Sequence, residues 1–211
     1  MWLIDLDRPP EGAAMTLGPA DVARVRGYLC GNDGARIAAG RAWLRVILGR
    51  YLDADPSRLE FETSPAGRPG LAGKNAGTLH FSLSRSADRG LVAVSRSPVG
   101  AEIELVRGRP GLADLVTSRF GAAEARCIAQ GCGGSPLRGF YRHWTAKEAY
   151  LKATGRGLAD LRRTELTCGA PLVMNVGGYR TSSAVSVLDA GRGYAAAIVG
   201  GSVTRVRAAR Q

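Results

Sequence analysis

The sequence contains few cysteine and histidine residues and no long apolar run. Its 211 residues include four cysteines, Cys30, Cys127, Cys132 and Cys168, and only two histidines. The cysteines form no Cys-x-x-Cys pair and the histidines are scattered, so we expect four reduced thiols and no zinc site of usual spacing. No stretch approaches the roughly 18 apolar residues that a membrane span requires. These absences argue against a zinc-binding protein and against a membrane protein.

The N-terminus also lacks the pattern of a secretory signal. Two aspartates fall within the first seven residues, and no basic start leads into a long apolar run. Together with the unpaired cysteines, this pattern predicts a cytoplasmic protein.

Lysine is scarce although the chain is strongly basic. The formal net charge is +11, yet only Lys74, Lys147 and Lys152 are lysines. Such a charge favours a polyanionic partner: a nucleic acid, an anionic membrane, a phosphorylated small molecule or an acidic protein. Aromatic residues make up 6% of the chain and offer few stacking platforms, and no zinc-finger or RNP-like motif is present. A nucleic-acid-binding domain therefore ranks below the other readings.

The pattern of elements predicts two α+β halves, residues 1–106 and 107–211. In the first half, apolar residues at helical spacing predict a helix over about 34–52. Three β-like runs follow and predict a small sheet packed on that helix, at 79–83, 90–95 and 99–104. In the second half, helices are expected near 111–130 and 136–153, and strands near 170–176, 183–188 and 193–199.

The helix near 136–153 has clear end signals. Ser135 can cap its N-terminus, Pro136 suits its first position, and Gly155 lies just past its end. Lys147 falls inside the apolar stripe of this helix, where a cation requires an anion or a cleft. Glu148 and Lys152 lie one turn apart along one edge of the same face, a spacing that is also typical of an ordinary helix ion pair.

The segment Gly100-Ala-Glu-Ile-Glu places two carboxylates on one face of a strand. The two-residue period of a strand puts Glu102 and Glu104 on one side and Ile103 on the other. Side by side, the carboxylates repel each other, and a bound cation such as Mg²⁺ would offset that cost. A solvated acidic face on an edge strand is the commoner explanation of such a triplet. The triplet alone therefore leaves both readings open.

Taken in order, three segments resemble the signatures of a known family. They are Phe81-Ser-Leu-Ser-Arg-Ser, Gly100-Ala-Glu-Ile-Glu, and Trp144-Thr-Ala-Lys-Glu-Ala-Tyr-Leu-Lys-Ala-Thr-Gly-Arg-Gly-Leu158. The order and spacing resemble the 4'-phosphopantetheinyl transferases of the Sfp type, whose signatures read FNLSHS, GVDIE and W-x-x-KEAxxK-x-x-G-x-GL. Gly67-Arg-Pro stands where the family has Gly-Lys-Pro. The resemblance covers roughly residues 20–200.

The resemblance implies a fold and an activity. The fold would be α+β, a pseudo-twofold arrangement of two similar halves with coenzyme A between them. The activity would be magnesium-dependent transfer of 4'-phosphopantetheine from coenzyme A to a serine hydroxyl of an acidic carrier-protein domain, releasing adenosine 3',5'-bisphosphate. Because one chain would hold both halves, a monomer is the simpler expectation, with neither a nucleic acid nor a membrane as partner.

The resemblance also implies roles for individual residues. Glu102, Glu104 and Glu148 would hold Mg²⁺. Glu148 would also be the base for the carrier serine, and Lys152 would neutralise charge on the diphosphate. The residues expected to contact coenzyme A are Arg36, Arg41, Arg68, Ser84, Arg85, Lys147 and Lys152.

Three residues depart from the family pattern. Glu102 replaces an aspartate, Arg85 replaces the histidine that binds the 3'-phosphate, and Ser82 replaces an asparagine. Glu102 adds one methylene to a magnesium site that tolerates little distortion. A guanidinium at position 85 can bind a phosphate with a charge that does not depend on pH. A degenerate member that binds coenzyme A or a carrier protein without efficient catalysis is the alternative reading.

Overall fold

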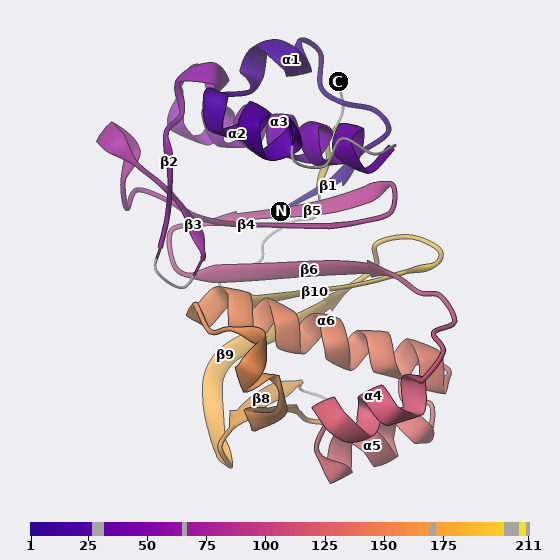
Figure 1. Ribbon diagram of the computed structural model, residues 1–211. Coiled ribbons are helices and arrows are strands. Elements are labelled where there is room, and N and C mark those ends of the chain that lie inside the picture. Colours follow the sequence, from indigo (N-terminus) through magenta and orange to yellow (C-terminus); the bar gives the residue numbers. More distant parts are fainter. Residues whose placement is uncertain (27–31, 65–66, 169–171, 201–206, 210–211) are drawn as a thin grey trace. The chain divides into compact units, whose positions relative to one another are not determined.

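The chain folds into two compact units. The computed structural model describes residues 1–26, 32–64, 67–168, 172–200 and 207–209. Unit 1 comprises Met1–Arg96 together with Val203–Gln211, and unit 2 comprises Ser97–Ser202 (Figure 1). Each unit combines a sheet of mainly antiparallel strands with a long helix, which confirms the α+β class. No helix among the described residues has both the length and the apolar character needed to cross a membrane.

The helices and strands follow the chain in two groups. Those of unit 1 are β1 (Trp2–Asp5), α1 (Ala13–Thr16), α2 (Pro19–Arg26), α3 (Asn32–Leu52), β2 (Phe61–Thr63), β3 (Pro69–Leu71), β4 (His80–Ser86), β5 (Arg89–Ser95) and β11 (Arg207–Ala208). Those of unit 2 are β6 (Val99–Leu105), α4 (Leu112–Arg119), α5 (Ala122–Ala129), α6 (Pro136–Thr154), β7 (Thr164–Leu166), β8 (Val173–Val176), β9 (Tyr179–Leu188) and β10 (Tyr194–Gly200).

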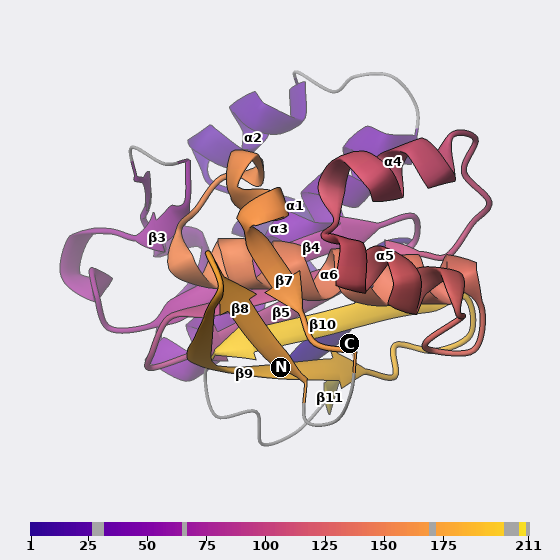
Figure 2. The same ribbon diagram turned by 90° about the horizontal axis from the view of Figure 1, so that it is seen from below.

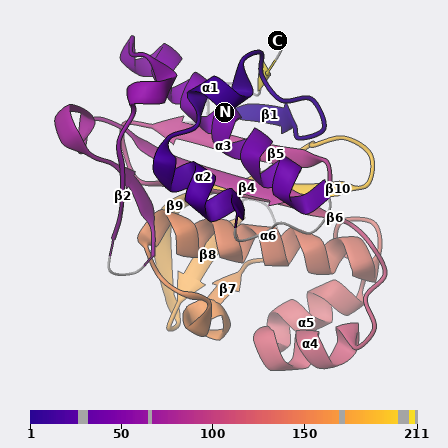
Figure 3. The same ribbon diagram turned by 45° about the horizontal axis from the view of Figure 1, so that its top comes forward.

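Unit 1 is built on a sheet of strand order β11-β1-β5-β4. Helix α3 covers one face of this sheet (Figure 3). Its residues Leu44, Ile47 and Leu48 are almost fully buried in a core that they share with residues of β1, β4 and β5. The predicted helix over 34–52 and its apolar stripe are therefore confirmed, except that Tyr51 is exposed.

Unit 2 is built on a sheet of order β6-β10-β9-β8-β7, in which every neighbouring pair is antiparallel (Figure 2). Helix α6 packs on β6 and β10 (Figure 1). A second apolar cluster, made of Phe120, Ile128, Phe140 and Tyr141, joins α4 and α5 to the N-terminal half of α6.

Helix α6 begins and ends where the sequence predicts. The hydroxyl of Ser135 accepts a hydrogen bond from the backbone N–H of Arg138 at 3.2 Å, which caps the first turn. At the other end, Gly155 adopts a left-handed φ of 68°, and the N–H of Arg156 donates to the carbonyl of Leu151 at 2.9 Å. These local contacts fix the length of the helix that carries Lys147, Glu148 and Lys152.

The boundary between the units differs from the predicted division into 1–106 and 107–211. Strand β6 pairs with β10 over its whole length, so it belongs to unit 2 and not to the sheet on α3. Strand β11 pairs in parallel with β1 and returns the end of the chain to unit 1. Both corrections arise from pairings between strands that are about 90 or more residues apart in the sequence. Local sequence patterns do not predict such pairings.

A close approach at Gly100 sets the position of α6 on β6. A Cβ added at Gly100 would lie 1.9 Å from the carbonyl oxygen of Ala149 and 2.5 Å from the backbone nitrogen of Ala153. Neither backbone atom can move without shifting the helix. Glycine is therefore required here by contact and not by a positive φ.

We predict that Gly100→Ala lowers the free energy of unfolding by roughly 1–3 kcal/mol, because the added methyl group forces α6 away from β6. Urea denaturation followed by circular dichroism measures the change. Gly108→Ala is the control, because a Cβ there meets nothing within 4 Å. Equal stability of Gly100→Ala and Gly108→Ala would contradict the proposed role of this contact.

Candidate functional site

Two carboxylates of β6 face the helix α6. Because side chains alternate along a strand, Glu102 and Glu104 lie on the same face as Gly100, the face on which α6 packs. Ile103 points to the other side and is fully buried. The predicted placement of the two glutamates on one face is thus the observed one.

Helix α6 brings a third carboxylate and a cation to the same place. Carboxylate oxygens of Glu102, Glu104 and Glu148 all lie within 4.8 Å of one another. Lys152, one turn after Glu148, forms an ion pair with Glu102 and also approaches the carbonyl of Ala101 at 3.4 Å. Glu102 is only 5% exposed. We call Glu102, Glu104, Glu148 and Lys152 the carboxylate cluster.

Crowding and burial change the acidity of Glu148. Burial, followed by the charge of Glu102, raises the pKa of Glu148 to about 7, against the lowering effect of Lys152. A hydrogen bond with the side chain of Trp144 also lowers this pKa, because an N–H donor favours the ionised carboxylate. In the sequence, Trp144 is the first residue of the third family signature, and no contact with Glu148 was predicted for it. Its position one turn before Glu148 was the available signal of this contact.

The donor set of the carboxylate cluster fits a divalent cation. Three carboxylates within a few ångströms repel one another, and the raised pKa of Glu148 reflects its burial first and that repulsion second. Hard oxygen ligands of this kind suit Mg²⁺ and similar ions. The longer side chain of Glu102 does not remove its oxygen from the cluster, so the three carboxylates lie together despite the departure from aspartate.

The structure gives Lys147 a different role from the predicted contact with coenzyme A. Its ammonium group is fully buried, lies 2.8 Å from Glu124 Oε2, and sits 4.5 Å above the ring of Phe120. Glu124 is completed by the backbone N–H groups of Leu166 and Gly121 at 2.8 and 3.0 Å. Lys147 is thus a buried ion-pair residue that joins α6 to α5, which explains a cation inside an apolar stripe.

Arg41 is likewise held in an ion pair. The carboxylate of Asp21 lies between Arg41 and Arg45, each with a nitrogen 2.5 Å from one of its oxygens. Asp21 is 1% exposed. Burial alone would raise the pKa of Asp21, but Arg41 and Arg45 outweigh it and lower that pKa. Two of the guanidinium nitrogens of Arg41 are therefore engaged with this buried carboxylate, and its side chain is 17% exposed.

Arg36 and Arg85 line one pocket of unit 1. The pocket has a volume of about 230 Å³ and is also lined by Leu6, Asp33, Ile37, Ser86 and Ala87. Arg36 forms a two-fold ion pair with Asp7, at 2.7 and 2.9 Å. The side chain of Arg85 lies against α3 because position 40 is glycine: a Cβ there would be 2.6 Å from Arg85 Cδ. The role of Gly40 was not predicted.

Arg68 and Ser84 lie apart from that pocket. Arg68 lines a different pocket of unit 1, of about 260 Å³, with His80 and Phe81. Burial lowers the pKa of Arg68, and burial and the nearby Arg68 lower that of His80. Ser84 lies on β4 next to Arg85 and is 4% exposed. Of the predicted coenzyme A contacts in unit 1, the structure therefore brings only Arg36 and Arg85 to one pocket.

Comparison with known proteins decides the family. The sequence model of the 4'-phosphopantetheinyl transferase superfamily matches residues 98–199, the segment that contains the carboxylate cluster. The 4'-phosphopantetheinyl transferase HetI of Nostoc sp. is 34% identical over 171 residues, which are 79% of this chain and 72% of that protein. The chain belongs to the 4'-phosphopantetheinyl transferase superfamily.

Other relatives of this transferase support the same family. A putative 4'-phosphopantetheinyl transferase of Synechocystis sp. is 32% identical over 161 residues, covering 75% of this chain and 65% of that protein. The 4'-phosphopantetheinyl transferase Sfp of Bacillus subtilis is 24% identical over 161 residues, covering 74% of this chain and 70% of that protein. As a member of the superfamily, the transferase moves a 4'-phosphopantetheine group to carrier proteins, and nothing here supports the degenerate alternative.

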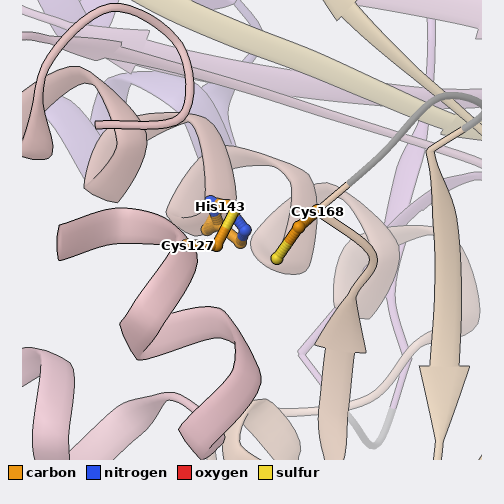
Figure 4. A group of neighbouring side chains, drawn as sticks. All are labelled: Cys127, His143 and Cys168. Carbon is orange, nitrogen blue, oxygen red and sulfur yellow. The ribbon is translucent and has the colours of Figure 1, made fainter. Parts of the chain in front are cut away.

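Cysteines and a histidine that are scattered in the sequence come together in the fold of the transferase, and the described cysteines are free thiols, as expected. Side chains of Cys127, His143 and Cys168 lie together in unit 2 (Figure 4). The sequence contained one signal of this grouping, because Cys127 and Cys132 are separated by four residues, a spacing that also occurs in zinc sites. Cys30 lies outside the described residues.

For Lys147 we predict a structural effect without an effect on ligand affinity. Lys147→Ala leaves Glu124 buried without its cation, which should cost about 3–5 kcal/mol of unfolding free energy. Denaturant titration measures this loss, and calorimetry on the folded variant should give an unchanged Kd for coenzyme A. The exposed Lys74→Ala is the control. If Lys147→Ala instead bound coenzyme A more weakly at unchanged stability, the result would support the contact with coenzyme A that the sequence predicted.

Proposed function

We propose that the transferase uses Mg²⁺ at the carboxylate cluster and coenzyme A as the phosphopantetheine donor. The observation that supports this proposal is the convergence of three carboxylates and Lys152 on adjoining faces of β6 and α6. Glu102, Glu104 and Glu148 would hold the metal ion, which when bound supplies positive charge to the diphosphate of coenzyme A. The net charge of +11 suits an acidic carrier-protein domain as acceptor.

In the proposed reaction, the serine hydroxyl of the carrier protein attacks the phosphorus atom that bears the pantetheine arm. The bond between this phosphorus and the oxygen of adenosine 3',5'-bisphosphate breaks, and the bisphosphate leaves with the electron pair. Glu148 accepts the serine proton as the general base. Lys152 provides a fixed cation beside the group on which negative charge develops.

We assign the phosphate groups of the adenine nucleotide to residues of unit 1. Arg36 and Arg85 line one pocket, and two guanidinium groups suit a phosphate dianion. Arg68 and Ser84 remain proposed contacts with other parts of the ligand. Arg41 and Lys147 are left out of the proposed site, because each is engaged with a buried carboxylate.

We predict that Glu104→Ala and Glu148→Ala each lower kcat/KM for carrier labelling by at least about a hundredfold, because each removes a carboxylate ligand and Glu148→Ala also removes the base. The measurement is covalent transfer of a fluorescent coenzyme A analogue to a panel of apo carrier proteins over a range of Mg²⁺ concentrations. Glu11→Ala, an exposed glutamate of unit 1, is the control. Near-normal turnover with an unchanged magnesium requirement in either variant would overturn the metal assignment.

For Arg85 we predict a loss of discrimination between coenzyme A and dephospho-coenzyme A. A charge-assisted contact with the 3'-phosphate should contribute roughly 1.5–3 kcal/mol, or about ten- to hundredfold in affinity. Arg85→Ala should therefore weaken coenzyme A binding while leaving the Kd of dephospho-coenzyme A nearly unchanged. Calorimetry at fixed salt separates this contact from general electrostatic attraction. Equal weakening of both ligands would show that Arg85 acts through overall charge or structure.

A further inference from the structure

Three cysteines and one histidine meet in unit 2, away from the residues assigned above. Cys127 lies on α5, His143 on α6, and Cys168 follows β7 (Figure 4). One sulfur or nitrogen ligand atom from each of these three residues lies within 4.8 Å of the others. Cys127 and His143 are buried, whereas Cys168 is exposed. Segments that are far apart in the sequence thus bring three potential metal-ligand atoms close together.

The hydrogen bonding of His143 leaves one ring nitrogen available as a ligand. His143 Nδ1 lies 2.8 Å from the carbonyl oxygen of Gly139, and because a carbonyl can only accept, Nδ1 carries the hydrogen. In the neutral ring, Nε2 therefore bears the lone pair. The residue is 1% exposed, and Nε2 has no hydrogen-bond partner within the described part of the chain. Histidines that bind metals commonly donate their other N–H to a carbonyl in this way.

A fourth donor lies beside this group. Cys132 Sγ is 4.0 Å from His143 Nδ1, and its side chain hydrogen bonds with that of Cys127. Cys132 is held there by the turn after α5, where its N–H donates to the carbonyl of Cys127 at 3.1 Å. Cys127 and Cys132 thereby form a C-x4-C pair on one turn.

We propose that Cys127, Cys132, His143 and Cys168 form a structural site for Zn²⁺. A tetrahedral zinc ion has Zn–S distances of about 2.3 Å, which places two sulfur ligands about 3.8 Å apart. The donor atoms of Cys127, His143 and Cys168 already lie within 4.8 Å of one another, so these three need only a contraction of about 1 Å. Cys132 is not part of that group, and its sulfur would have to turn toward the ion to complete the site. Three sulfur ligands and one imidazole are a known structural zinc set, and soft sulfur donors disfavour Mg²⁺.

Cationic side chains lie near two of the proposed ligands. Three thiolates and Zn²⁺ carry one net negative charge, and the cations Arg126 and Arg142 lie near Cys168 and Cys127, respectively. These two arginines would partly offset the negative charge of the occupied site.

The zinc site would connect the elements that hold α6. Its ligands come from α5, α6, the turn after α5, and the segment after β7, so one ion would join four parts of unit 2. His143 lies five positions before Glu148 on the same helix. The site would therefore stabilise the helix that carries Glu148, without contacting the carboxylate cluster. The proposal does not depend on the function proposed above.

Cobalt substitution tests the ligand set directly. The reduced, metal-free full-length protein is titrated with Co²⁺ without oxygen and in excess Mg²⁺, which occupies oxygen-rich sites. We expect one equivalent of Co²⁺ to give thiolate-to-cobalt charge-transfer absorption and the visible bands of tetrahedral cobalt, and one equivalent of Zn²⁺ to abolish both. Cys168→Ser should lose at least a third of the charge-transfer intensity, and so should Cys132→Ser. Cys30→Ser and Glu104→Ala should retain the full intensity.

A second measurement needs no variant. Because Cys168 is exposed, iodoacetamide can reach it in the metal-free protein, and one equivalent of Zn²⁺ should slow its alkylation at least tenfold. Mg²⁺ should have no effect, and peptide mass spectrometry locates the label. The proposal is overturned if the reduced protein shows no thiolate-to-cobalt absorption, if Cys168→Ser or Cys132→Ser keeps the full intensity, or if Zn²⁺ leaves the alkylation of Cys168 unchanged.

Discussion

The close contact between the backbones of α6 and β6 is the constraint on which the carboxylate cluster depends. At Gly100 the helix lies so near the strand that no side chain fits between them. The same face of β6 carries Glu102 and Glu104, and the adjoining face of α6 carries Glu148. Carboxylates that repel one another are thus held together by packing between backbones, which leaves their charge available to a cation. The repulsion is tolerated because it is local and Lys152 partly offsets it.

The two lysines of α6 form ion pairs that differ in their exposure to solvent. Lys147 and Lys152 are five positions apart and both pair with a glutamate. The Lys147 pair with Glu124 is closed to solvent and its other donors and acceptors are satisfied within unit 2. The Lys152 pair with Glu102 involves a side chain that is 39% exposed. Lys152 is therefore open to solvent, whereas breaking the Lys147 pair would leave two buried charges uncompensated.

Features encoded within a few residues could be predicted from the sequence. The caps at Ser135 and Gly155 gave the limits of α6, and the alternation of β6 gave the shared face of Glu102 and Glu104. Features that depend on distant partners could not be predicted. Helical spacing showed that Lys147 lies among apolar residues, but its partner Glu124 is 23 positions earlier on another helix. For the same reason, the grouping of Cys127 with His143 and Cys168 becomes visible only once α5, α6 and β7 are packed.

The pairing of β11 with β1 has a consequence for the order in which the chain folds. Unit 2 is continuous in sequence, whereas unit 1 consists of two segments that flank it. During synthesis from the N-terminus, all strands of the unit 2 sheet emerge before β11 does. Unit 2 can therefore complete its sheet while β1, at the edge of the unit 1 sheet, still lacks a partner on one side. The last residues of the chain thus cover an open sheet edge, the kind of surface through which partly folded chains associate.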